Sequence, residues 1–258
     1  MDNASVASKV PAITLGFWIV KVLATTLGET GGDTVSMTMN LGYLTGTAIF
    51  ASLLIVLVAL QIKARAFHPF LYWSTIVAST TAGTTLADFA DRSLGVGYAG
   101  GSTILAACVI AVLALWYRAE GSVSVSTVNT PRVEAFYWAT ITFSQTLGTA
   151  LGDWAADDTG LGYVGAALVF GAALAIVAIA YYRTKISHVL LFWVAFVLTR
   201  PLGATVGDFL DKPLDHGGLA LSRPIASVVL GIVIIALLLL IPQKPAMGSA
   251  RPRGNPDR

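Results

Sequence analysis

Long apolar stretches separated by short polar segments run through the whole chain. A helix crosses the hydrocarbon core of a bilayer with about 20 apolar residues, and eight stretches reach that length. They cover residues 11–33, 42–62, 69–89, 97–117, 132–154, 162–182, 187–209 and 220–241. This pattern predicts an all-α, polytopic membrane protein with eight transmembrane helices.

One set of residues recurs at fixed distances within these stretches. A Trp precedes an Asp by 15 residues four times, and a Gly stands five residues before each Asp. The sets are Trp18, Gly28 and Asp33; Trp73, Gly83 and Asp88; Trp138, Gly148 and Asp153; and Trp193, Gly203 and Asp208. The Asps are 55, 65 and 55 residues apart, so the second two repeats copy the first two at an offset of 120. The grid indicates one helical hairpin used four times in parallel, in two duplicated halves.

The polar segments divide the chain into two membrane halves. The first half, 11–118, holds repeats 11–62 and 69–118, and the second, 132–241, holds repeats 132–183 and 187–241. Segment 119–131 is rich in Ser and Thr and is expected to be the cytoplasmic linker between them. The tail 242–258 is rich in Pro, Gly and Arg, which predicts a disordered cytoplasmic end.

Charge is scarce and unevenly distributed. Only 12% of the residues are charged and 55% are hydrophobic, whereas soluble domains have about 25% charged residues. Lys and Arg gather in alternate loops and at both ends of the chain, which places both termini in the cytoplasm. The protein is therefore expected to be a multi-pass protein of the cytoplasmic (inner) membrane with its Asp-bearing ends outside. The four Trps lie near the basic loops, where an interfacial aromatic belt is expected.

A polar stripe continues inward from each Asp, because residues four apart share one face of a helix. The stripes comprise Glu29, Thr25 and Lys21 before Asp33; Thr84 and Thr80 before Asp88; Thr149 and Gln145 before Asp153; and Arg200 before Asp208. We expect the four Asp-bearing helices to surround a common centre, shielded from lipid by the other four. Charges deep in a membrane need partners, so Glu29 is expected to pair with Lys21 or Arg200.

The grid of Trp, Gly and Asp resembles bacterial membrane proteins catalogued as a tandem repeat of unknown function, with two spans and a marked Trp per repeat. The resemblance covers residues 12–241. The fourth repeat departs most, because Pro201 stands where the others have Thr26, Thr81 and Thr146. The resemblance implies the fold and the membrane location, and it implies no activity.

The four Asps, with Glu29, are the candidate cation-binding residues. Their carboxylates are hard oxygen ligands that suit Mg, Ca or Mn, so Asp33, Asp88, Asp153 and Asp208 are also the candidate metal ligands. Thr25, Thr80, Thr84, Gln145 and Thr149 would form a polar path below them, and Lys21 and Arg200 would couple movement of the ion. The alternative is that the Asps are carboxylates at wet helix ends and bind no ligand.

The predicted function is therefore transport of a cation. A divalent metal such as manganese is the candidate ion, and coupling to protons is an optional part of the prediction. The alternative is a structural or sensory membrane protein with a charge-locked core and no transported ligand. No nucleophile–base arrangement, nucleotide-binding Gly loop or zinc motif is visible, so the protein is not expected to be an enzyme. No cofactor other than a divalent cation is expected. The expected partners are the lipid bilayer, an inorganic cation and, as an option, further copies of the chain, but no nucleic acid.

Overall fold

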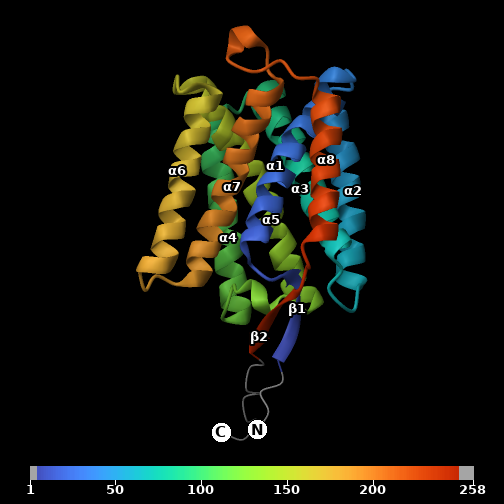
Figure 1. The fold of residues 1–258 in the computed structure, drawn as a ribbon, viewed down its shortest axis with the longest axis vertical. Helices are drawn as coiled ribbons and strands as arrows, with labels where there is room; N and C mark the ends of the chain where they lie inside the picture. The colour runs from blue at the N-terminus through green and yellow to red at the C-terminus, as the bar shows by residue number, and fades with distance from the viewer. Residues whose placement is uncertain (1–4, 250–258) are drawn as a thin grey trace, which may run out of the picture.

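The computed structural model describes residues 5–249, which form an upright bundle of eight α-helices with a short two-stranded ribbon at one end (Figure 1). The helices are α1 Leu15–Asp33, α2 Tyr43–Lys63, α3 Pro69–Asp88, α4 Tyr98–Glu120, α5 Pro131–Asp153, α6 Gly162–Arg183, α7 His188–Asp211 and α8 Arg223–Leu240. Their bounds follow the eight apolar stretches of the sequence to within a few residues. The predicted all-α fold is confirmed.

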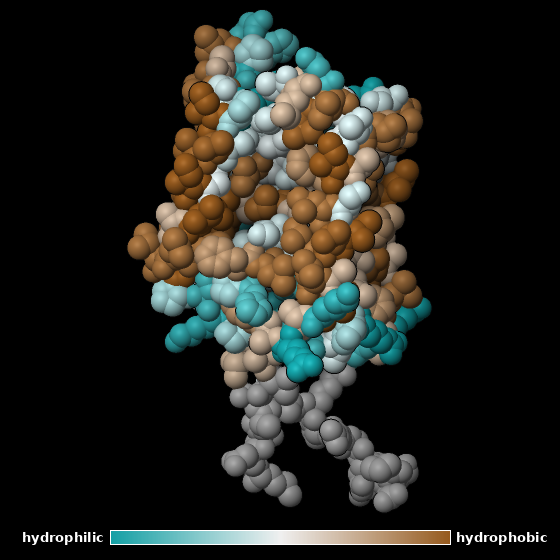
Figure 2. Space-filling view, turned by 90° about the vertical axis from the view of Figure 1, so that its right-hand side faces the viewer, coloured by the Kyte–Doolittle hydropathy of each residue, from teal (hydrophilic) through white to brown (hydrophobic). Residues whose placement is uncertain are grey.

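Five of the described helices are long and apolar enough to cross a membrane, namely α2, α4, α6, α7 and α8. Helices α2, α4, α6 and α8 bury little of their surface in the bundle. Figure 2 shows a broad band of hydrophobic side chains across the face it presents, with hydrophilic residues gathered at the two ends. These features are those of a multi-pass membrane protein.

The first helices of the four repeats form the interior of the bundle. Helix α1 packs on α3, α3 on α5, α5 on α7, and α7 back on α1, so the four close into a ring. Most of their Thr, Ser and charged side chains are buried in this ring. The expectation that the Asp-bearing helices surround one centre is therefore met.

The second helix of each repeat packs mainly on the first helix of the next repeat. Helix α2 lies on α3, α4 on α5, α6 on α7, and α8 on α1. The last repeat thus wraps back onto the first, and each hairpin is open rather than closed on itself. The outer helices surround the inner ring as expected, and each one covers the Asp-bearing helix of the next repeat.

The repeated glycines allow the inner helices to approach closely. A Cβ on Gly28 of α1 would overlap the side chain of Thr80 on α3, and a Cβ on Gly148 of α5 would overlap the stem of Arg200 on α7. Gly83 meets Gln145 and Gly203 meets Thr25 in the same way. Each repeated Gly therefore packs against the residue that stands eight positions before the Asp of the neighbouring helix. This contact recurs around the ring.

The fourth repeat ends differently from the other three. Helices α1, α3 and α5 end at their repeat Asp and continue as π-helical turns, Thr34–Thr38, Phe89–Ser93 and Trp154–Asp158. Helix α7 instead runs three residues past Asp208 to Asp211, and the chain leaves it at Lys212 and Pro213. The α-helical hydrogen bonding of this repeat therefore continues past its Asp without a π-helical turn.

The two ends of the described chain meet in an antiparallel ribbon, β1 Ser5–Pro11 with β2 Pro245–Ser249. The ribbon also contacts the linker, where Ser8 Oγ donates to the carbonyl of Val125 at 2.7 Å. The predicted disordered tail is therefore corrected for residues 245–249, whose backbone pairs with the N-terminal strand; residues 250–258 lie outside the described part of the chain. The pairing joins segments far apart in sequence, which local composition does not reveal.

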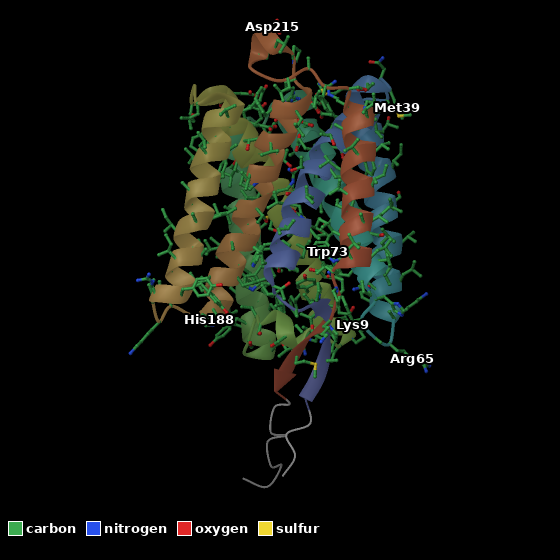
Figure 3. The ribbon with its side chains drawn as sticks, viewed as in Figure 1. Lys9, Met39, Arg65, Trp73, His188 and Asp215 are labelled. Carbon is green, nitrogen blue, oxygen red and sulfur yellow. The ribbon has the colours of Figure 1, made fainter. Side chains whose placement is uncertain are left out.

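The repeated Trps are buried inside the bundle rather than placed in a lipid-facing belt. Trp73, Trp138 and Trp193 are at most 4% exposed, and only Trp18 is partly exposed. They pack with Tyr72, Tyr137, Phe17, Phe192 and Trp116 into one aromatic cluster. Trp73 lies in the half of the bundle nearer the ribbon (Figure 3). The expected belt is corrected, because the Trp indoles fill the space between the inner helices and the indole N–H of Trp193 donates to the linker carbonyl of Val123 at 2.9 Å.

Candidate functional site

An ion pair between α7 and α1 lies at the centre of the inner ring. Arg200 Nη2 donates to Glu29 Oε2 at 2.9 Å, and both side chains are buried. The same nitrogen lies 2.6 Å from Thr84 Oγ1 on α3 and 2.6 Å from Thr149 Oγ1 on α5. One guanidinium therefore connects all four inner helices.

The repeat explains why these groups meet. Glu29, Thr84 and Thr149 occupy the same position, four residues before the Asp of their repeat. The fourth repeat has Ala204 there, and Arg200 stands one helical turn earlier. Because equivalent positions lie at one level of the ring, three oxygen-bearing side chains face the guanidinium of the fourth helix. Of the two partners expected for Glu29, the structure brings Arg200 to it.

The four repeat Asps are divided into two pairs, each bridged by a basic residue. Lys212 Nζ lies 2.9 Å from Asp33 Oδ2 and 2.9 Å from Asp208 Oδ1. Arg92 Nε lies 3.0 Å from Asp88 Oδ1, and its Nη2 lies 3.5 Å from Asp153 Oδ2. All four Asps are buried. The same clamp, a basic residue between two Asps, thus occurs twice. Lys212 joins α7 to α1, and Arg92 joins α3 to α5.

Both bridging residues remain charged in this setting. Burial alone would lower the pKa of Lys212, but the carboxylates of Asp208 and Asp33 outweigh it and raise the pKa above the ordinary value. The pKa of Arg92 is raised in the same way, with burial opposed by Asp88 and Asp153. The two bases are therefore expected to carry their positive charges at neutral pH.

Arg92 and Lys212 were not among the predicted site residues, although the sequence holds a signal for them. They are 120 residues apart, each four residues after a repeat Asp, and so follow the duplication. Arg223 was also missed; its Nε lies 3.6 Å from Asp33 Oδ2 and 3.4 Å from Asp211 Oδ1. It stands outside the grid at the start of α8, where only the packing of α8 on α1 brings it to the site.

Three of the predicted carboxylates come close enough to share one cation. Oxygens of Glu29, Asp33 and Asp208 lie within 4.8 Å of one another, and among the described residues this is the group of acids that could hold a metal. Asp88 and Asp153 do not join it. The predicted ring of four Asps around one ion is therefore replaced by a three-carboxylate group next to a separate pair.

The five residues of the predicted polar path are all buried, and their hydrogen bonds differ. Thr25 Oγ1 donates within its own helix to Val22 at 2.8 Å, and Thr84 Oγ1 lies 3.5 Å from Glu29 Oε2. Lys21, the other predicted coupling residue, lies deeper. Its Nζ is 3.4 Å from Gln145 Oε1 and 4.2 Å from the ring centre of Phe196.

The candidate site faces the end of the bundle that lies away from the ribbon. Asp215 and Met39 mark that end, whereas Lys9, Arg65 and His188 lie at the ribbon end (Figure 3). The side chains of Arg92 and Lys212 are 31% and 11% exposed, so the clamps reach the surface. In the other direction the aromatic cluster closes the ring, with the Tyr72 and Tyr137 hydroxyls 2.7 Å apart.

Comparison with known proteins gives a family match over most of the chain. A family model described as Repeat of Unknown Function (DUF347) matches four times, at residues 16–67, 71–122, 136–187 and 191–241. These four segments coincide with the four hairpins. No curated protein and no solved structure matches the chain.

Proposed function

Because this chain belongs to the Repeat of Unknown Function (DUF347) family, whose description names no activity, we propose a function from its site: transport of a small inorganic cation across the cytoplasmic membrane. The carrying observation is the buried group of Glu29, Asp33 and Asp208, whose oxygens lie within 4.8 Å of one another. Carboxylate oxygens select hard divalent cations, of which manganese is the candidate we favour.

Lys212 supports this proposal because its ammonium already occupies a position between two of the carboxylates. It lies 2.9 Å from both Asp33 and Asp208, and its side chain is 11% exposed. An arriving cation would displace the ammonium outward, and the two Asps would then ligate the ion with Glu29. Arg200, bonded to Glu29, would lose that partner and so link binding to a rearrangement of all four inner helices. Proton coupling would follow if a carboxylate took up a proton when the ion left.

The proposal includes eight membrane spans with both termini in the cytoplasm. The distribution of Lys and Arg between alternate loops supports this orientation. The Asp-bearing end then faces outward, and the aromatic cluster and ribbon close the cytoplasmic side. Reporter fusions after Arg118 and after Asp158 should indicate cytoplasm and exterior respectively, and the opposite result would reverse the orientation.

One observation favours the rival function, a structural or sensory membrane protein with a locked core. Every repeat Asp has a basic partner, Lys212 for Asp33 and Asp208 and Arg92 for Asp88 and Asp153. Such pairs could hold four helices together without any transported ligand. The two functions predict different effects of neutralising a carboxylate, because only a transporter would lose ion uptake.

The deciding experiment is uptake of manganese by liposomes that contain the purified protein. Asp33→Asn and Asp208→Asn should each reduce uptake at least about tenfold, since each removes a charged ligand. Asp215→Asn, which neutralises an exposed Asp of the outer loop, should leave uptake unchanged. Normal uptake by both site variants, or no uptake by the wild type, would favour the locked core.

A further inference from the structure

A second buried basic residue, Lys21, lies on the ribbon side of the Arg200–Glu29 pair. Lys21 is fully buried, and among the described residues no carboxylate lies within 4.0 Å of its Nζ. Its neighbours are the amide oxygen of Gln145 at 3.4 Å and the face of Phe196 at 4.2 Å. With Lys21 protonated, Lys21 and Arg200 would bring two positive charges to this part of the ring, where Glu29 supplies one negative charge.

The same region holds hydrogen-bond donors without acceptors. Arg200 Nε and Nη1, Gln145 Nε2 and the hydroxyl of Thr80 have no hydrogen-bond partner among the described residues, and all three side chains are fully buried. Buried donors of this kind are rare in folded proteins and destabilise the fold when they stay unsatisfied, most of all when they are charged. All of these donors therefore require a hydrogen-bond acceptor.

These groups lie at one place because of the repeat. Thr80, Gln145 and Arg200 are equivalent residues, each eight positions before its Asp, and each packs against the repeated Gly of the preceding inner helix. Lys21 stands one turn deeper on α1 and reaches up to Gln145. Phe196, Ile76 and Ile141 occupy the level of Lys21 on the other three helices and are fully buried, so the region is closed toward the ribbon by apolar side chains.

We propose that Lys21, Gln145 and Arg200 form a binding site for a small monovalent anion such as chloride. An anion would accept from the orphaned amide and guanidinium nitrogens and would balance the second positive charge. A charge without a counter-ion is energetically unfavourable at this depth, so binding of an anion beside it is favourable. The site shares Arg200 with the Arg200–Glu29 pair, but it uses Nε and Nη1 of the guanidinium, whereas Glu29 is bonded to Nη2. The proposal does not depend on cation transport.

The rival explanation for Lys21 is that its amine is neutral. A neutral amine needs no counter-ion, so the protein would then be indifferent to halides. The two explanations therefore differ in a property of the wild-type protein that does not require any variant to fold.

The test is equilibrium binding of radioactive chloride to the purified protein, together with its melting temperature in sodium chloride and in sodium gluconate of equal ionic strength. We expect one saturable chloride per chain and a higher melting temperature in chloride. Lys21→Gln should weaken chloride binding at least about tenfold, the effect of losing a charged hydrogen-bond donor. Lys185→Gln, which removes an exposed Lys of the basic end, should change neither measurement.

A second variant supplies the missing charge from the chain itself. Gln145→Glu would place a carboxylate beside Lys21 with almost no change in size, so it should fold in gluconate as stably as in chloride and should no longer bind the ion. Absence of saturable chloride binding to the wild type, or equal melting temperatures in both salts, would overturn the proposal. Persistence of chloride binding in Gln145→Glu would overturn the assigned position.

Discussion

At the scale of residues, the centre of the molecule is one guanidinium with partners from three other helices. Its Nη2 makes all three contacts, and the other donors of the planar guanidinium, Nε and Nη1, have no partner among the described residues. Glu29 lies on α1 together with Lys21, eight residues apart, which is about 12 Å along a helix. Lys21 therefore cannot reach Glu29 within the same straight helix, and the pair forms with Arg200 instead.

Replacing one member of this pair should destabilise the protein strongly, because the other charge then stays buried without its partner. Glu29→Gln leaves Arg200 buried without its carboxylate and should lower the free energy of unfolding by about 3–5 kcal/mol. Arg200→Gln should cost a similar amount, while the double variant should cost clearly less than the two single losses added together. Unfolding measured in detergent for all four proteins gives this coupling energy. Strictly additive losses would mean that the two charges do not act as a pair.

The sequence predicted which residues belong to this site more accurately than it predicted how they are arranged. The polar stripes indicated Glu29, Arg200, Thr84 and Thr149, and the structure brings these four side chains together. The sequence left the choice between Lys21 and Arg200 open, because that choice depends on the relative heights of neighbouring helices. It also missed the division of the Asps into pairs, because Arg92 and Lys212 resemble ordinary loop charges.

At the scale of elements, the helices were predictable and their partners were not. Apolar stretches fix where a membrane helix begins and ends, since the bilayer requires about 20 apolar residues. They do not tell which neighbour an outer helix covers. Adjacent hairpin helices are the default partners, yet here α2, α4, α6 and α8 each pack mainly on the following repeat. The ribbon escaped prediction for a related reason, since β1 and β2 lie at opposite ends of the chain.

The glycines of the inner ring give a direct test of this packing. Gly148→Ala would place a Cβ against Arg200 and Pro201, forcing α5 and α7 apart, and should lower the free energy of unfolding by about 1–3 kcal/mol. Gly171→Ala on α6 is the matched control, because no heavy atom lies within 4 Å of its added Cβ apart from its chain neighbours and the backbone of its own helix. Equal stability of the two variants in detergent would contradict the close approach of the inner helices.

At the scale of the whole molecule, the four repeats form a ring that differs from end to end. One end carries the buried carboxylates with their partly exposed basic partners. The other end is filled by the aromatic cluster and covered by the ribbon and linker, and Lys9 Nζ of the ribbon lies 2.6 Å from Glu134 Oε1 of α5. Duplication alone would give four equal units. The departures from equality, Glu29, Lys21, Arg200 and Ala204, are gathered at the centre, where the proposed function needs them.

The central claim is that the carboxylate group can exchange its built-in cation, Lys212, for a free one. Manganese binding to the purified protein, followed by the electron paramagnetic resonance of the free ion, tests this most directly. We predict one saturable site per chain, at least about tenfold weaker in Asp33→Asn and tighter in Lys212→Gln, because the latter removes the competing ammonium. Asp215→Asn should bind as the wild type does. Absence of saturable binding, or weaker binding in Lys212→Gln, would contradict the account.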